Sequence, residues 1–158
     1  MKYRVSFVLA LLMSAVFTIQ VQAQEEWVWD EYGIGFTLSK GMKVTQNDGE
    51  TFTAERDNLF LTITPIKDEE ITEGDLAMAV FTMAKEMEYD GIEDADKLEL
   101  DDLVGYYVEG TKDGAGAFVI ALLDQESESN YLVIIVFDDD SRDEAIEMAQ
   151  SMYAYDGK

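Results

Sequence analysis

Hydrophobic residues in this chain change their spacing in a definite order, from every second residue to a helical repeat and back. Alternation with period two is typical of β-strands, and a period of 3.6 is typical of amphipathic helices. Strand patterns fill residues 34–64, a helical pattern covers 73–89, strand patterns return over 97–137, and a helical pattern closes the chain. This order predicts an α+β domain, an antiparallel β-sheet flanked by two helices, with three to four strands before each helix, β(3-4)-α-β(3-4)-α.

The first half of the domain has short strands joined by tight turns. Ile34, Phe36 and Leu38 alternate with small or polar residues and predict one strand. Residues 42–46 and 51–56 predict a hairpin, because the Asn-Asp-Gly sequence between them has the chemistry of a tight turn. Another strand is predicted directly after the hairpin, over residues 59–64.

Both helical patterns carry a signal for their first turn. Thr72 with Asp75 and Ser141 with Glu144 have the spacing of a capping box, and Gly91 is the predicted stop of the first helix. Each helix has an apolar stripe on one face. The stripes are Leu76, Ala79, Val80, Met83 and Met87 in the first helix, and Ala145, Ile146, Ala149, Met152 and Tyr153 in the second.

Two segments of the second half are apolar almost without interruption. Residues 117–123 and 131–137 have this composition, which suits central strands buried on both faces. Their connections are short and polar, so antiparallel hairpins are the expected wiring.

The first 23 residues have the composition of a secretory signal peptide. Lys2 and Arg4 precede an apolar run over 5–19, and the run is shorter than the roughly 20 residues of a membrane-spanning helix. Small residues end the segment at Ala23, which predicts cleavage there and a mature domain of residues 24–158. We therefore expect a periplasmic or secreted protein with no membrane insertion after cleavage.

Composition excludes several classes of chemistry. The chain has no cysteine, so it has no disulfide and no lipid-modified cysteine, and it has no histidine, which excludes histidine-dependent catalysis and the usual zinc ligand sets. All 34 acidic residues follow Ala23, against nine of the 11 Lys and Arg residues, which gives the mature domain a formal charge of −25. Such a surface repels nucleic acid and attracts cations or basic partners.

Asp138, Asp139 and Asp140 form the densest carboxylate cluster, directly before the final helix. Carboxylate oxygens in a loop suit calcium, so a calcium- or other cation-binding module is one alternative function. The spacing does not match the calcium loop of a helix-loop-helix hand, because Arg142 falls on the third ligand position. Acidic residues also stabilise the start of a helix, which explains the cluster without a metal.

A second acidic stretch spans residues 94–102 around Leu98 and Leu100. Charges of this kind are typical of an edge strand, where they prevent sheet-to-sheet aggregation. A carboxylate pair for glycoside hydrolysis is conceivable, and a small carboxylate-dependent hydrolase is the second alternative function, although nothing in the sequence marks one pair.

Trp27 and Trp29 lie two residues apart and project to one side of the chain if this segment is extended. They form either a stacking platform for a ligand or partner, or part of the core beneath the sheet.

The order of these elements from Tyr32 to Tyr155 resembles the PsbP-like superfamily. The residues that carry the resemblance are the opening strand Gly-Ile-Gly-Phe-Thr-Leu at 33–38 and the segment Gly-Tyr-Tyr-Val-Glu-Gly at 105–110, which leads through paired apolar strands to a terminal helix. The chain departs from the family at Lys40-Gly41-Met42, where a Pro-x-Gly-Trp type turn is usual. The resemblance implies binding or assembly without catalysis, and it transfers no site residue.

The sequence as a whole favours an exported, soluble, non-enzymatic binding or accessory protein. The expected partner is a protein, either basic or membrane-associated, and not a nucleic acid. No catalytic, cofactor-binding or metal-ligating residue is assigned, and no cofactor is expected.

Overall fold

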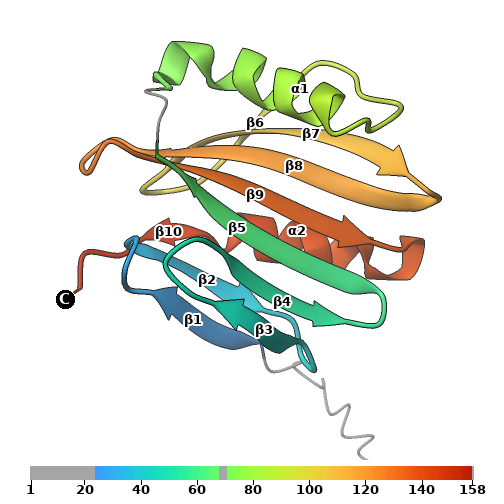
Figure 1. Ribbon diagram of the computed structural model, residues 1–158, viewed down its shortest axis with the longest axis horizontal. Helices are drawn as coiled ribbons and strands as arrows, with labels where there is room; N and C mark the ends of the chain where they lie inside the picture. Colours follow the sequence, from blue (N-terminus) through green and yellow to red (C-terminus); the bar gives the residue numbers. More distant parts are fainter. Residues whose placement is uncertain (1–23, 68–70, 158) are drawn as a thin grey trace, which may run out of the picture.

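The computed structural model describes residues 24–67 and 71–157, and this part of the chain is mostly β-structure (Figure 1). Ten strands form two antiparallel sheets, and there are two short α-helices among the described residues. The predicted signal peptide, residues 1–23, lies outside the described residues. Within the described ranges, neither helix is long and apolar enough to cross a membrane.

The larger sheet has seven strands, and each pairs antiparallel with its neighbours. The strands predicted after residue 42, from alternating patterns or from continuous apolar runs, are all present in it. In spatial order they are β3 (Lys43–Asn47), β4 (Phe52–Arg56), β5 (Leu59–Ile66), β9 (Ser129–Phe137), β8 (Ala115–Asp124), β7 (Val104–Lys112) and β6 (Asp96–Leu98).

The smaller sheet has three strands and joins the two ends of the described chain. β2 (Ile34–Leu38) is its central strand, between β1 (Glu25–Trp29) and β10 (Tyr153–Ala154). In Figure 1 β1 and β2 lie in the lower part of the view, at the same height as β3 and β4 of the larger sheet, and the C-terminus is on their left.

The predicted fold class, an α+β domain with one antiparallel sheet flanked by two helices, is therefore wrong. The strand pattern of Ile34–Leu38 is correct, but this strand pairs with β1 and β10 instead of joining the larger sheet. Periodicity reports that a strand forms and not which strand it pairs with. Tyr153 was predicted to belong to the last helix, and it lies instead in β10.

The two helices lie against different parts of the molecule. α1 (Leu76–Glu86) packs on β7 and β8, and α2 (Arg142–Gln150) packs on β9 and β2. Each begins after a 3₁₀ turn, and both are shorter than the patterns predicted.

The helix starts use different groups from those of the predicted capping boxes. The Thr72 hydroxyl donates to the Asp75 carboxylate at 2.6 Å. Before α2 the capping acceptor is Asp138 instead of the predicted Ser141, since Asp138 Oδ1 accepts from the Ser141 N–H at 2.9 Å. The end of α1 also differs, because Glu88, at φ 62°, is the first left-handed residue after the helix, and Gly91, at φ 70°, lies three residues further on.

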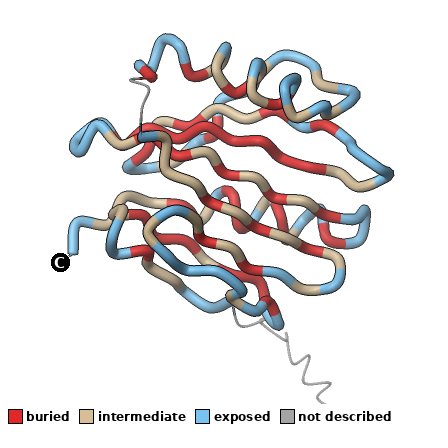
Figure 2. The backbone as a smooth tube through the Cα atoms, viewed as in Figure 1, coloured by how far each residue is buried: buried red, intermediate tan, exposed pale blue. Residues whose placement is uncertain are grey.

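Two hydrophobic clusters lie on opposite faces of the larger sheet. One fills the space between this sheet, the smaller sheet and α2, and the other lies beneath α1. β8 is buried along most of its length, as its continuous apolar run predicted, whereas β9 alternates (Figure 2). Trp29 is only 3% exposed, and the half-buried Trp27 contacts Phe52 with ring centroids 5.9 Å apart. The tryptophan pair therefore belongs to the core.

Candidate functional site

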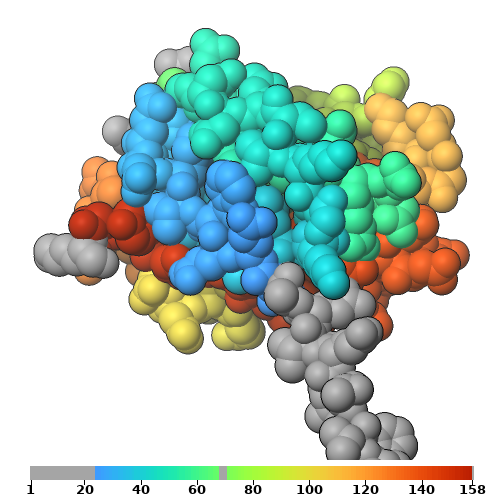
Figure 3. Space-filling view, turned by 90° about the horizontal axis from the view of Figure 1, so that it is seen from below, coloured from blue at the N-terminus to red at the C-terminus, as the bar shows by residue number. Residues whose placement is uncertain are grey.

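Helix α2 lies between two depressions of the surface. On one side, the polar cleft has a volume of about 660 Å³ and is lined by Ser39, Lys40, Glu144, Glu147 and neighbouring residues. On the other side, the acidic groove runs between α2 and strands β6 and β7. Figure 3 shows the molecule from the side of the smaller sheet, where the N-terminal strands and the β3–β4 hairpin make up most of the face.

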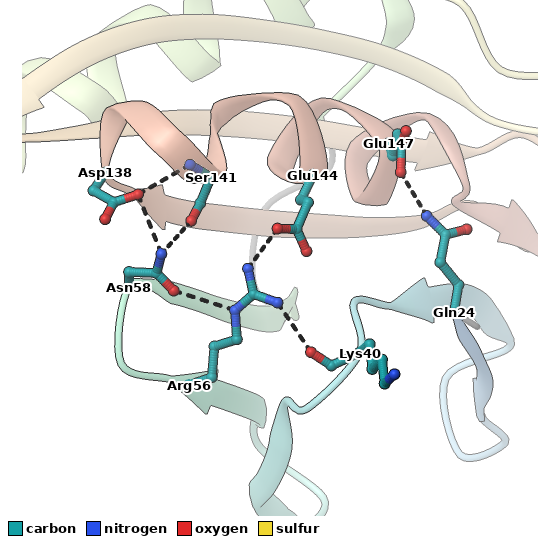
Figure 4. A network of polar contacts seen from close by, with 8 residues as sticks. All are labelled: Gln24, Lys40, Arg56, Asn58, Asp138, Ser141, Glu144 and Glu147. Atoms are coloured by element: carbon teal, nitrogen blue, oxygen red, sulfur yellow. Dashed lines mark hydrogen bonds and ion pairs between the residues drawn. The ribbon is translucent and has the colours of Figure 1, made fainter. Parts of the chain in front are cut away.

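Arg56, at the end of β4, is the centre of a polar network beside the polar cleft (Figure 4). Its Nη2 donates to Glu144 Oε1 of α2 at 2.6 Å, and its Nη1 donates to the backbone carbonyl of Lys40 at 2.9 Å. Its Nε donates to Asn58 Oδ1 at 3.2 Å. One side chain thus joins α2 to the turns that precede β3 and β5.

The same network explains the aspartate cluster before α2. Asn58 Nδ2 donates to Ser141 Oγ at 2.6 Å and lies 3.4 Å from Asp138 Oδ1. The hydrogen bond from Ser141 is the largest of the interactions that lower the pKa of Asp138. Within residues 24–67 and 71–157, no group of three or more carboxylates is placed to hold a metal ion. The geometry is that of a carboxylate closing the first turn of a helix.

The carboxylates of the polar cleft are held by donors. The hydrogen bond from Arg56 lowers the pKa of Glu144, and Gln24 Nε2 donates to Glu147 Oε2 at 2.8 Å. A glycosidase general acid needs the opposite shift, a raised pKa that keeps its proton near neutrality. The contacts of Glu144 therefore fit a structural ion pair.

The acidic groove has an apolar pocket of about 200 Å³ at one end. Its floor comes from buried side chains of β6 and β8, and half-buried Tyr107 of β7 and Ile146 of α2 form its walls. Exposed polar and charged residues also line it, namely Lys97, Glu99, Arg142 and Gln150. The apolar residues of the pocket are Leu98, Tyr107, Phe118, Ile120, Ile146 and Ala149.

The other end of the groove is an acidic shelf of about 470 Å³. Four carboxylates line it, and none of its lining residues is basic. Tyr107 lines both the shelf and the apolar pocket, so the two are adjacent. The lining residues of the shelf are Gly91, Glu93, Asp94, Asp96, Tyr107 and Glu109.

An ion pair lies where the shelf meets the pocket. Arg142 of α2 donates through Nε and Nη2 to the two carboxylate oxygens of Glu109 on β7, at 2.8 and 2.7 Å. Its guanidinium carbon lies 5.6 Å from the ring centroid of Phe118. This hydrogen bonding lowers the pKa of Glu109 and raises that of Arg142. Glu109 is therefore a carboxylate that stays charged and already has a partner.

Strand register brings the groove residues together. Asp96 is opposite Tyr107, which is opposite Ile120, and Glu109 is opposite Phe118. Residues directly opposite one another point to the same face of a sheet, which here is the face covered by α2.

Gly110 allows the chain before β6 to pass close to β7. A Cβ atom at this position would lie 3.1 Å from the carbonyl oxygen of Asp90 and 3.1 Å from the Ile92 side chain. The bridge between Asp90 and Thr111 holds the segment there. This close approach carries the chain past β7 to Gly91 and Glu93, which line the shelf.

Only part of this site was predictable from the sequence. The acidic stretch 94–102 was predicted to be a charged edge strand, and β6 is one of the two edge strands of the larger sheet. Its neighbours in the groove, Tyr107, Glu109 and Arg142, were not predicted, because strand pairing and α2 supply them. Glu109, the one acidic residue of β7, was the available signal.

The fold defines a class of small, mostly β domain in which two antiparallel sheets enclose a core with a terminal helix. A scan of protein-family models and a search of curated proteins give no match for the sequence. Among solved structures, the chain is similar to the Ran-binding protein Mog1p of Saccharomyces cerevisiae, with a TM-score of 0.54 and 9% identity over 84% of this chain and 96% of that one. The structure of a point mutant of Mog1 matches with a TM-score of 0.54 and 9% identity, over 85% and 97% of the two chains. At this identity the similarity shows the fold.

The predicted localisation, periplasmic or secreted, is contradicted by this comparison. The two structures named above are of Mog1, described for the yeast protein as Ran-binding, and neither is described as periplasmic or secreted. The cleavage pattern depends on the composition of residues 1–23 alone, which says nothing of the domain that follows.

Proposed function

We propose that this protein is a non-enzymatic protein-binding module that takes a basic segment of its partner. The observation that carries the proposal is the acidic groove, where an apolar pocket lies next to a shelf lined by four carboxylates. Protein interfaces typically combine an apolar centre with a polar rim, and opposite charge increases the rate at which partners meet.

The fold supports the same class of function. Mog1p, whose structure resembles this chain, is described as a Ran-binding protein, so a domain of this shape can serve to bind another protein. The resemblance to the PsbP-like superfamily, with its implied binding or assembly role, is kept as a hypothesis beside it.

Neither alternative function gains a specific observation. Asp138 of the predicted cation cluster accepts from Ser141 and Asn58, and Glu144 of the polar cleft is paired with Arg56. These contacts therefore favour neither a cation-binding module nor a carboxylate hydrolase.

Selection from a random peptide library tests the proposal. We expect the immobilised protein to enrich peptides rich in Lys and Arg that also contain an aliphatic or aromatic residue. Exposed charges are screened over about 8 Å at physiological ionic strength, so binding of these peptides weakens as salt is added. Recovery of acidic peptides, or of no common sequence, would contradict the proposal. The same peptides with Glu in place of Lys and Arg are the control.

A further inference from the structure

The size of the apolar pocket limits what it can hold. Its volume of about 200 Å³ is below the roughly 300–1,000 Å³ of typical small-molecule sites. Phe118 and Ile120 close its floor, and they are 4% and 0% exposed. A cavity of this size with an apolar floor suits one aliphatic side chain.

The spacing between pocket and shelf matches that of an extended chain. Tyr107 forms the wall between them, and Glu109 lies two residues further along β7 on the same face. Two residues of a strand span about 7 Å. A bound extended segment has the same repeat, so its residues i and i+2 project to the same side.

The charge of the shelf determines which kind of partner side chain binds beside the pocket. Glu93, Asp94 and Asp96 are exposed on the shelf, and none of the described residues that line the shelf itself is basic. Two basic residues line the adjoining pocket: Arg142, which is paired with Glu109, and Lys97 of β6. The chain as a whole carries a formal charge of −23. A cationic side chain at the shelf therefore meets unneutralised carboxylates.

On the basis of the proposed function, we propose that the acidic groove binds an extended segment of a partner protein with a leucine-sized side chain and a lysine or arginine two residues away. The aliphatic side chain enters the pocket beside Ile146, and the cation lies on the shelf beside Asp94 and Asp96. The apolar anchor supplies burial, and the cation sets the direction and register of the segment.

A short synthetic peptide tests this register. The probe is the capped peptide Gly-Lys-Thr-Leu-Thr-Lys-Gly-Trp, and the register control, Gly-Thr-Lys-Leu-Lys-Thr-Gly-Trp, has the same composition with the lysines next to the leucine. Neighbouring residues of an extended chain point to opposite sides. We expect calorimetric titration to give a dissociation constant at least about fivefold lower for the probe, the scale of one well-placed ion pair.

Variants of the full chain locate the binding. The double variant Asp94→Asn, Asp96→Asn removes two shelf charges at exposed positions, and we expect it to weaken the probe by about fivefold. Ile146→Lys places a charge at the pocket wall and is expected to weaken binding by about tenfold or more. The matched control is Glu86→Gln, Glu126→Gln, which removes two exposed charges outside the groove and is expected to change the affinity less than about twofold.

The outcomes separate this inference from the proposed function. Equal weakening by the shelf variant and by its control, or equal binding of the two peptides, overturns the assignment to the groove but leaves a module that binds basic segments. If neither this probe nor any library-selected basic peptide binds, both proposals fail. Thermal melts of each variant show whether it is folded when it is measured. We expect the asparagine variant to be folded, because its changes lie at exposed positions.

Discussion

Arg56 joins α2 to the turns that precede β3 and β5 through one side chain. Its guanidinium bonds Glu144, the Lys40 carbonyl and Asn58, and the Arg56 and Glu144 side chains are 22% and 27% exposed. Truncation of the Arg56 side chain leaves Glu144 without its ion-pair partner. We expect Arg56→Met to lower the free energy of unfolding by about 1–2 kcal/mol at pH 7, measured by urea denaturation.

The pH dependence of this loss follows from the lowered pKa of Glu144. A carboxyl with a lowered pKa in the folded state contributes stability above its unfolded pKa of about 4.5 and loses it as the pH falls through the folded value. The difference between wild type and Arg56→Met should therefore shrink below about pH 4.5. A constant difference between pH 7 and pH 3 would contradict the ion pair. Arg142→Met is the matched control, with an expected loss below about 1 kcal/mol because Arg142 and Glu109 are 44% and 40% exposed.

At the level of elements, the end of helix α1 departs from ordinary residue preference. Glu88 has a φ of 62°, where a residue with a Cβ atom is strained, and its N–H bonds the Lys85 carbonyl. We expect Glu88→Gly to raise the free energy of unfolding by about 0.5–1 kcal/mol. Glu86→Gly, two residues earlier and still helical, should lower it instead, since glycine is a poor helix former. The same sign for both substitutions, in thermal or urea unfolding, would be evidence against this role of Glu88.

Local patterns predicted individual elements well and their assembly poorly. The hairpin at 42–56 and the continuous apolar run that became β8 were recognisable because tight turns and buried strands have local signatures. The pairing of β2 with β10 joins residues more than a hundred positions apart and has no local signature. The two residues of β10 are also too few to show alternation.

The acidic groove illustrates the same limit at the site. Asp96 and Leu98 were recognisable as residues of a charged edge strand, because alternation within one strand is local. The pocket exists only because the register places Tyr107 opposite Ile120, and because α2 brings Ile146 over that face of the sheet. Neither relation can be read from the spacing of residues along the chain.

On the scale of the whole molecule, acidic charge dominates a chain that has 34 Asp and Glu residues against 11 Lys and Arg. General attraction alone would let a basic peptide bind anywhere on such a surface. The groove is distinguished by combining charge with an apolar pocket, and this combination predicts one preferred location.

Mapping a bound basic peptide by NMR tests this claim most directly. Amide shifts of the ¹⁵N-labelled protein are followed while the leucine–lysine probe is added at physiological salt. We predict that the largest shifts fall in β6, in β7 around Tyr107 and Glu109, and in α2 from Arg142 to Ala149, with little change in α1 or the β3–β4 hairpin. Shifts spread evenly over the acidic surface, or concentrated away from these three elements, would contradict the acidic groove as the binding site.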